Sequence, residues 1–245
     1  MFPIRDHNPS GRVPFVTYAL LAINIAVFLS YWFTLRSGYE LGAFYYTWGL
    51  VPAQLMQGHG LGGLITHMFL HGGWLHLAGN MLFLWIFGDN LEDEMGHVGY
   101  LLFYLTCGLA AAGLQVIGNP WFDGPLVGAS GAIAGVLGGY LMLFPRARVD
   151  VLLIFIIFFR VFSIPAWIVL SVWFVVQAFH GYAATEDGVA YLAHIGGFVA
   201  GAVMVLPILL RRGGRAFWAR NEGMPPHPEA KYKLSPSRIP RVPKR

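Results

Sequence analysis

The chain has 245 residues, of which 56% are hydrophobic and only 11% are charged, and its mean hydropathy is +0.58. A soluble domain of this size needs a more strongly charged surface, so the composition excludes a soluble globular protein and indicates an integral membrane protein. The net charge of +4 comes mainly from connections and from the C-terminal segment, so it does not argue for nucleic-acid binding.

The chain begins with a short polar segment, residues 1–13, that carries two arginines before a long apolar run. This run is longer than the apolar core of a signal peptide, and no small-residue cleavage site follows it, so we expect an uncleaved first span. A helix needs about 20 mostly apolar residues to cross a bilayer. Six segments are predicted to do so, at about 14–34, 73–89, 97–117, 127–145, 164–180 and 189–210.

Four further segments lie outside the predicted spans. Residues 35–63 are rich in aromatic residues and glycine, and we expect an ordered element in the outer interface. Residues 151–163 are apolar but include Arg160, so we expect them to lie along the cytoplasmic interface, while 89–95 forms an acidic cytoplasmic turn. The basic, proline-rich segment 211–245 is predicted to be a disordered cytoplasmic tail near anionic lipid. The sequence thus divides into 1–13, a six-span core at 14–210, and this tail.

The distribution of positive charge predicts the orientation. Of the 16 lysines and arginines, all except Arg36 fall in the N-terminal segment, the connection after the fourth span, or the tail. Cytoplasmic segments of membrane proteins carry the excess of lysine and arginine, so both termini are predicted to be cytoplasmic.

Strongly polar side chains inside spans are costly and are therefore candidates for function. With the predicted orientation, the second, fourth and sixth spans enter from the outer side. At 1.5 Å per residue, Ser130 lies roughly 6 Å deep, and His194, His76 and Asn80 lie at nearly the same depth. Four polar side chains from three spans therefore converge on one level.

These four residue types suit acyl transfer. Ser130 needs a base, and a neutral His194 can take its proton and later protonate the leaving amine. His76 and Asn80 are four residues apart, on one helical face, and both can donate hydrogen bonds to an oxyanion together with the Ser130 N–H. No carboxylate is predicted at this depth, so we expect a dyad without a third member.

Small residues predict how the fourth and sixth spans meet. Glycines recur at four-residue spacing in both, and such faces let membrane helices approach closely. They are Gly131, Gly135 and Gly139 in the fourth span, and Gly197 and Gly201 in the sixth.

The same residues resemble the rhomboid family of intramembrane serine proteases. The matching motifs are Gly128-Ala129-Ser130-Gly131, His76-x-x-x-Asn80 and Ala193-His194-Ile195-Gly196-Gly197 followed by Gly201. Their order and spacing fit the six-span core of the family, so the resemblance covers about residues 10–210.

The resemblance implies an all-α, six-helix membrane bundle without a cofactor or metal. It implies Ser130 as nucleophile, His194 as base, and His76 and Asn80 as oxyanion donors. His71, Gly128, Gly131, Gly197 and Gly201 would be structural residues near the site. The implied substrates are single-span transmembrane proteins, cleaved near the outer membrane face, with access gated by the second and fifth spans. The compact core suggests a prokaryotic plasma membrane, and the oligomeric state is not indicated.

Two positions depart from patterns found in some members of the family. Ala134 stands where those members have a tyrosine that packs on the catalytic histidine, so His194 must be oriented in another way. Leu64-Ile65 stands near the position of a Trp-Arg pair.

Three alternatives remain at this point. The chain could be an inactive rhomboid-like protein that binds membrane clients without cutting them. His67, His71 and His76 could hold a metal or haem, although no acidic or cysteine ligand completes the set. A small-solute transporter is the third, but we find no internal repeat of the kind that such proteins show.

Overall fold

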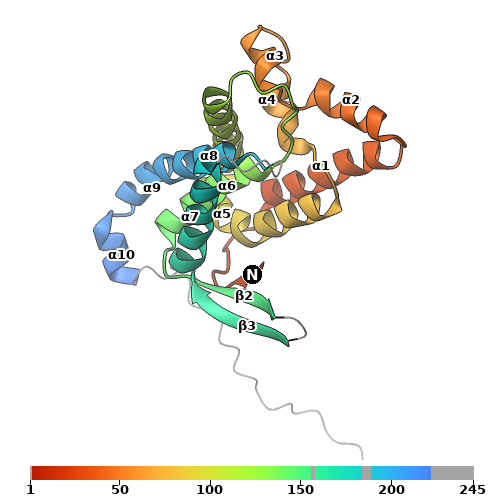
Figure 1. The fold of residues 1–245 in the computed structure, drawn as a ribbon. Helices are drawn as coiled ribbons and strands as arrows, with labels where there is room; N and C mark the ends of the chain where they lie inside the picture. Colours follow the sequence, from red (N-terminus) through yellow and green to blue (C-terminus); the bar gives the residue numbers. More distant parts are fainter. Residues whose placement is uncertain (1, 156–157, 184–188, 222–245) are drawn as a thin grey trace, which may run out of the picture.

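The computed structural model describes residues 2–155, 158–183 and 189–221. Helices dominate this part of the chain (Figure 1). In chain order the elements are β1 (Phe2–Asp6), α1 (Phe15–Trp32), α2 (Gly38–Trp48), α3 (Pro52–Met56), α4 (Gly63–Thr66), the 3₁₀ turn η1 (His67–Phe69), α5 (Trp74–Gly118), α6 (Ser130–Leu143), β2 (Arg148–Phe155), β3 (Phe158–Pro165), α7 (Ala166–Tyr182), α8 (Tyr191–Met204), α9 (Leu206–Arg211) and α10 (Arg215–Asn221).

The predicted spans correspond to helices. The second and third lie in α5, which has 45 residues but is broken at Gly96, where φ is 71° and ψ is 167°. The segment 89–95, predicted as a turn, is therefore helical up to this glycine. α1, α5 and the continuous segment Tyr191–Arg211 are long and apolar enough to cross a membrane, whereas α6 and α7 are shorter apolar helices. The structure confirms the predicted all-α membrane bundle. In the part of the chain that the structure describes, six apolar helical segments follow one another once α5 is divided at Gly96.

α6 is the central helix. Its residues from Gly131 to Tyr140 are all buried, and it packs mainly against α5 and α8. A helix that is apolar on every side is expected to be surrounded by other helices, as is the case here. The side chains in the first turn of α6 are consequently positioned by neighbouring helices.

Glycines bring α6 and α8 together until their backbones touch. A Cβ atom on Gly197 would overlap the carbonyl oxygen of Gly131, and a Cβ atom on Gly201 would overlap that of Gly135. The predicted small-residue faces of these two helices do meet, in the manner expected for close helix pairs in membranes. Their close approach fixes the first turn of α6 next to the first turn of α8.

Glu92, in the middle of α5, caps the start of α1. Its carboxylate accepts hydrogen bonds from the backbone N–H groups of Val16 and Thr17, both at 2.8 Å, and from the Thr17 hydroxyl at 2.7 Å. An anion at a helix N-terminus is stabilised by the unpaired N–H groups there, so this contact anchors α1 to α5.

A small antiparallel sheet with the strand order β1-β2-β3 is the main difference from the prediction. Residues 151–155 and 158–163 lie in two antiparallel strands, with Arg148 opposite Pro165 and Phe155 opposite Phe158, instead of a single interfacial stretch. β1 pairs with β2 and comes from the N-terminal segment. Val149 and Val151 are fully buried, so alternate residues of β2 pack against the bundle.

Polar contacts fasten β1 to the rest of the molecule. Asp150 of β2 accepts hydrogen bonds from Arg5 Nη2 at 2.7 Å and pairs with His7 Nε2 at 2.9 Å. Asp6 accepts a hydrogen bond of 2.7 Å from the hydroxyl of Tyr140, near the C-terminal end of α6. Burial raises the pKa of Asp6 to about 7, although the Tyr140 hydrogen bond lowers it in part. The sheet therefore belongs to the end of α6 that is remote from Ser130.

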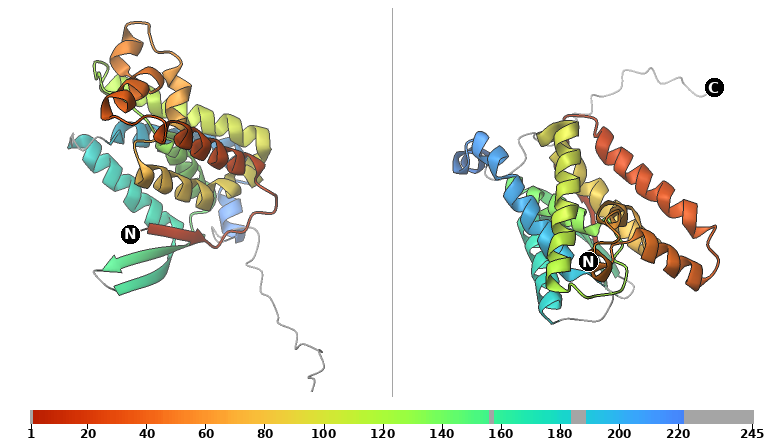
Figure 2. Two further views of the ribbon diagram at one scale, coloured as in Figure 1. Left: turned by 90° about the vertical axis from the view of Figure 1, so that its right-hand side faces the viewer. Right: turned by 90° about the horizontal axis from the view of Figure 1, so that it is seen from above.

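The connection 35–63 forms the ordered element that was predicted. It contains α2, α3 and α4, and Ser37 and Glu40 form a reciprocal capping box at the start of α2. In both the view of Figure 1 and the left view of Figure 2, this element and the sheet lie at opposite ends of the molecule. In the predicted tail, α10 is helical, and the tail from residue 222 onward lies outside the described residues.

Candidate active site

Ser130 is the first residue of α6. The sequence placed it about four residues inside a continuous helix, but residues 127–129 are not helical. Gly128 has φ of 136°, a conformation that side chains disfavour, and its N–H donates to the carbonyl oxygen of His67 at 2.9 Å. The first N–H groups of a helix have no acceptor within the helix, so the Ser130 amide is suited to bind an anion.

The hydroxyl of Ser130 meets the imidazole of His194. The distance between Ser130 Oγ and His194 Nε2 is 2.8 Å, which is a hydrogen bond between side chains 64 residues apart in the sequence. His194 lies in the first turn of α8, and the glycine contacts between α6 and α8 bring the two first turns together. The structure thus brings together the two residues that the sequence proposed as nucleophile and base.

The other nitrogen of His194 contacts α7. Its Nδ1 lies 2.7 Å from Oε1 of Gln177, which is buried. An amide oxygen can only accept, so this contact fits the form of the imidazole that has its proton on Nδ1 and presents the Nε2 lone pair to Ser130. The ring of Trp173, also on α7, lies 5.8 Å from the His194 ring, centroid to centroid.

No role for Gln177 could be predicted from the sequence. The only signal available was an amide inside an apolar segment, which is costly to bury and so marks a candidate. No spacing rule connects residue 177 with residue 194, because they lie on different helices. Ala134 is buried in α6, and Gln177 and Trp173 of α7 contact the His194 ring.

His76 faces the same space from the start of α5. The N–H of Gly72 donates to His76 Nδ1 at 3.3 Å, so in the neutral ring the proton is on Nε2. A Cβ atom on Gly128 would lie 2.8 Å from His76 Nε2 and 3.5 Å from Ser130 Oγ. The missing side chain of Gly128 therefore leaves a space between an N–H donor and the serine hydroxyl.

Asn80 lies one turn further along α5 and is buried. Its side-chain Nδ2 donates to the carbonyl oxygen of His76 at 3.1 Å, so the amide is held against its own helix. An amide nitrogen has two hydrogens, and the second is not needed for this bond. Asn80 thus lies on the predicted face, one turn from His76, and the second hydrogen of its Nδ2 group can still be donated.

His67 and His71 have structural contacts. His67 Nδ1 lies 2.7 Å from the carbonyl oxygen of Gly63, one turn earlier. The ring of His71 is fully buried and lies 5.1 Å from that of His76, while its carbonyl oxygen accepts hydrogen bonds from the hydroxyls of Tyr31 and Tyr45. Over the described ranges, no three side chains of the metal-binding types gather into a group that could hold an ion.

The fold and the site define a class of protein. It is a polytopic α-helical membrane protein in which a serine and a histidine are in hydrogen-bond contact at one end of the bundle. A family model described as the Rhomboid domain matches residues 58–211, which is more than half of the chain. The chain belongs to the rhomboid family.

Curated relatives agree with this assignment. Rhomboid protein 1, mitochondrial, from Saccharomyces cerevisiae is 30% identical over 203 residues, which are 77% of this chain and 51% of that protein. RHOMBOID-like protein 5 from Arabidopsis thaliana is 30% identical over 172 residues, covering 70% of this chain and 51% of the relative. Rhomboid protease GluP from Bacillus subtilis is 41% identical over 78 residues, 32% of this chain and 15% of that protein.

The chain spans about half the length of the first two of these relatives. The yeast relative is named as mitochondrial, and another relative, Rhomboid-like protein 11 from Arabidopsis thaliana, is named as chloroplastic. The chain is an integral membrane protein of this family, and the prokaryotic plasma membrane stays a prediction.

Proposed function

We propose that the protein is an intramembrane serine endopeptidase that cleaves transmembrane proteins with a Ser130–His194 dyad. The observation that carries the proposal is the 2.8 Å contact between Ser130 Oγ and His194 Nε2 inside a membrane bundle. Polar side chains inside membrane spans are costly, so a serine and a histidine in hydrogen-bond contact there are candidates for function.

The geometry supports a two-step acyl transfer. His194 Nε2 accepts the hydroxyl proton as Ser130 Oγ attacks the substrate carbonyl carbon, and the carbonyl oxygen becomes an oxyanion. The proton then passes from His194 to the amine that leaves as the peptide bond breaks. Water then attacks the acyl-enzyme while His194 accepts a proton from it. The bond between the acyl carbon and Ser130 Oγ breaks, His194 returns the proton to Oγ, and the new carboxyl end of the substrate leaves.

Donors for the oxyanion lie on the other side of Ser130. The His76 Nε2–H faces the space left by Gly128, and the Ser130 N–H opens α6. Asn80 adds an amide next to His76. Donors fixed in advance stabilise the developing charge without reorganising during the reaction, and removal of one such donor typically costs about 10²–10³ in kcat.

The substrate class follows from where the site lies. Ser130 and His194 belong to the first turns of apolar helices, so a scissile bond must reach them from within or near the membrane. A single-span transmembrane segment, locally unwound, is the simplest chain that can do so. The proposed domain is 14–210, with the site toward the outer face.

The test is labelling of the detergent-purified protein with a fluorophosphonate probe, which reacts with activated serines. We expect the parent to label and both Ser130→Ala and His194→Ala to lose labelling. Ser30→Ala is the matched control, because Ser30 is an exposed serine on α1 whose hydroxyl bonds its own helix. His76→Ala and Asn80→Ala should slow cleavage of a transmembrane substrate less than the dyad variants.

A client-binding protein without catalysis is the other candidate, and the same experiment separates the two. If the parent fails to label while an active rhomboid labels under the same conditions, the dyad does not activate its serine and the binding function is favoured. If Ser30→Ala abolishes labelling as well, the probe reports folding and not the dyad.

A further inference from the structure

We propose that Gln177 is the positioning residue of the base, and that it makes the dyad competent only while the C-terminal half of α7 is packed against α8. The proposal rests on the function proposed above, because it concerns how His194 serves Ser130. The carrying observation is the 2.7 Å contact between His194 Nδ1 and Gln177 Oε1, which lies on the far side of the imidazole from Ser130.

The contact selects one form of the imidazole. A neutral histidine has one protonated nitrogen, and only the form with the proton on Nδ1 can accept the serine proton at Nε2. In the other form, Nε2–H would donate to Ser130 Oγ, and the serine would have no base. Because Gln177 Oε1 has lone pairs and no proton, it holds the useful form in place.

The position of Gln177 is otherwise difficult to explain. The buried residues of α7 are Ala166, Val169, Leu170 and Gln177. Three of these are apolar and lie in the first turns of the helix, so Gln177 is the buried residue of its C-terminal half. A buried amide costs free energy unless it is hydrogen-bonded, and an apolar residue there would avoid that cost. The His194 contact repays it.

The second part of the proposal follows from where Gln177 is attached. α7 makes far less contact with α6 and α8 than these two helices make with each other. Val175, Val176 and Phe179 of its C-terminal half are exposed on the outside of the bundle. This half is held by Gln177, by the Trp173 and Phe174 rings against α8, and by a 3.1 Å contact between His180 and the hydroxyl of Tyr191.

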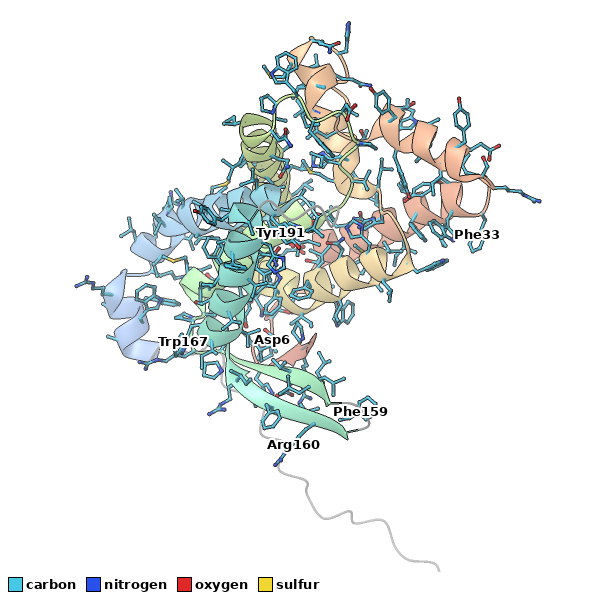
Figure 3. The ribbon with its side chains drawn as sticks, in the orientation of Figure 1. Asp6, Phe33, Phe159, Arg160, Trp167 and Tyr191 are labelled. Carbon is cyan, nitrogen blue, oxygen red and sulfur yellow. The ribbon has the colours of Figure 1, made fainter. Side chains whose placement is uncertain are left out.

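Tyr191 is the first residue of α8 and lies close to α7, near the middle of the view in Figure 3. Because Ser130 and His194 belong to the rigid α6–α8 pair, movement of α7 would leave their distance unchanged. It would remove only the acceptor at Nδ1. The dyad would then stay assembled but lose its preferred proton position, which links the state of α7 to the chemistry.

The first test measures the proton directly and needs no activity. The protein is labelled with ¹⁵N-histidine, and the His194 ring signals are assigned by their loss in His194→Ala. We expect the parent to carry the proton on Nδ1 and Gln177→Leu to move it wholly or partly to Nε2. Gln115→Leu is the matched control, because Gln115 is also a membrane amide bonded to α8, through Ala193 N at 3.1 Å. A parent with the proton on Nε2 would overturn the proposal.

The second test measures the rate of substrate cleavage against pH. Gln177→Leu should lower kcat by about tenfold or more with little change in KM, because a general base contributes about 10²–10⁴. Gln177→Glu keeps an acceptor and adds a negative charge, so it should retain more activity than Gln177→Leu and move the acidic limb of the profile to higher pH. A residue that only packs would give equal losses in both variants without this shift, and that result would refute the positioning role.

The outcomes separate this proposal from the function on which it rests. If Ser130→Ala and His194→Ala abolish cleavage while Gln177→Leu matches the parent in rate and profile, the dyad stands and Gln177 has no part in it. If the parent cleaves nothing, the proposed function fails, but the ¹⁵N spectra still show whether Gln177 sets the proton position.

Discussion

Gly128, two residues before Ser130, has a backbone position that suits only glycine. Its φ of 136° disfavours any side chain, and a Cβ atom there would come within 2.8 Å of His76 Nε2. The same space is where an oxyanion bound by the Ser130 and His76 N–H groups would lie. One glycine thus allows both the turn into α6 and room for the reacting carbonyl oxygen.

Gly128→Ala should therefore reduce fluorophosphonate labelling to near that of Ser130→Ala. The backbone strain alone costs on the order of 1–3 kcal/mol, and the methyl group also occupies the oxyanion space. Gly58→Ala is the control, since Gly58 has φ of 80° but nothing within 4 Å of the added Cβ atom. If both variants lose stability and labelling equally, strain explains the effect and Gly128 has no separate role at the site.

At the scale of single residues, the sequence identifies side chains better than it identifies their partners. Ser130, His194 and His76 could be selected because polar residues in spans are rare and must be compensated. The hydrogen bond between Gln177 and His194 could not be predicted, because it depends on how α7 is rotated against α8. The hydrogen bond from Asn80 to the carbonyl oxygen of its own helix could not be predicted either, because a side-chain amide can rotate to bond different partners.

At the scale of elements, the pair α6–α8 controls the distance between the two proposed catalytic residues. A Cβ atom on Gly201 would overlap the backbone of Gly135, which cannot move like a flexible side chain. Gly201→Ala should push the helices apart, separate Ser130 from His194, and destabilise the bundle by about 1–3 kcal/mol.

The measurement is the labelling rate together with the thermal midpoint in detergent. Gly113→Ala serves as the comparison, because Gly113 lies in α5 with nothing within 4 Å of the added Cβ atom. That change should leave labelling intact and, if anything, stabilise the helix, since alanine favours helices by about 1 kcal/mol over glycine. Parental labelling in Gly201→Ala would show that the helices do not need this contact.

The sheet shows where prediction of elements fails. The apolar residues of β2 and β3 lack strict alternation, so a buried strand cannot be told from an interfacial helix by periodicity alone. The pairing partner of β2 is β1, with Pro3 opposite Val151, and no local pattern indicates a contact between segments so far apart. The spans, in contrast, are predictable because a bilayer demands length and apolarity from each of them.

At the scale of the whole molecule, α6 joins two different ends. Ser130 starts the helix, and its last residues lead to β2, so the proposed active site and strands β2 and β3 lie at opposite ends of α6. Phe159 and Arg160 lie toward the far end of these two strands, away from the helices (Figure 3). Sequence charge predicts that this end is cytoplasmic, and the site is then expected near the outer face.

Cysteine labelling tests this orientation. Replacing the buried Cys107 by alanine gives a background without thiols, into which Arg160→Cys and Tyr39→Cys are introduced one at a time. Tyr39 is 86% exposed on α2, and Arg160 is exposed on β3. In intact cells, an impermeant maleimide should label residue 39 and leave residue 160 unlabelled, and inside-out vesicles should reverse the result. The reversed pattern in intact cells would place the Ser130 end of α6 on the cytoplasmic side, so substrates would have to be cut near that face. Labelling of both residues from one side would contradict the crossing pattern itself, because α6 could not then connect the two faces.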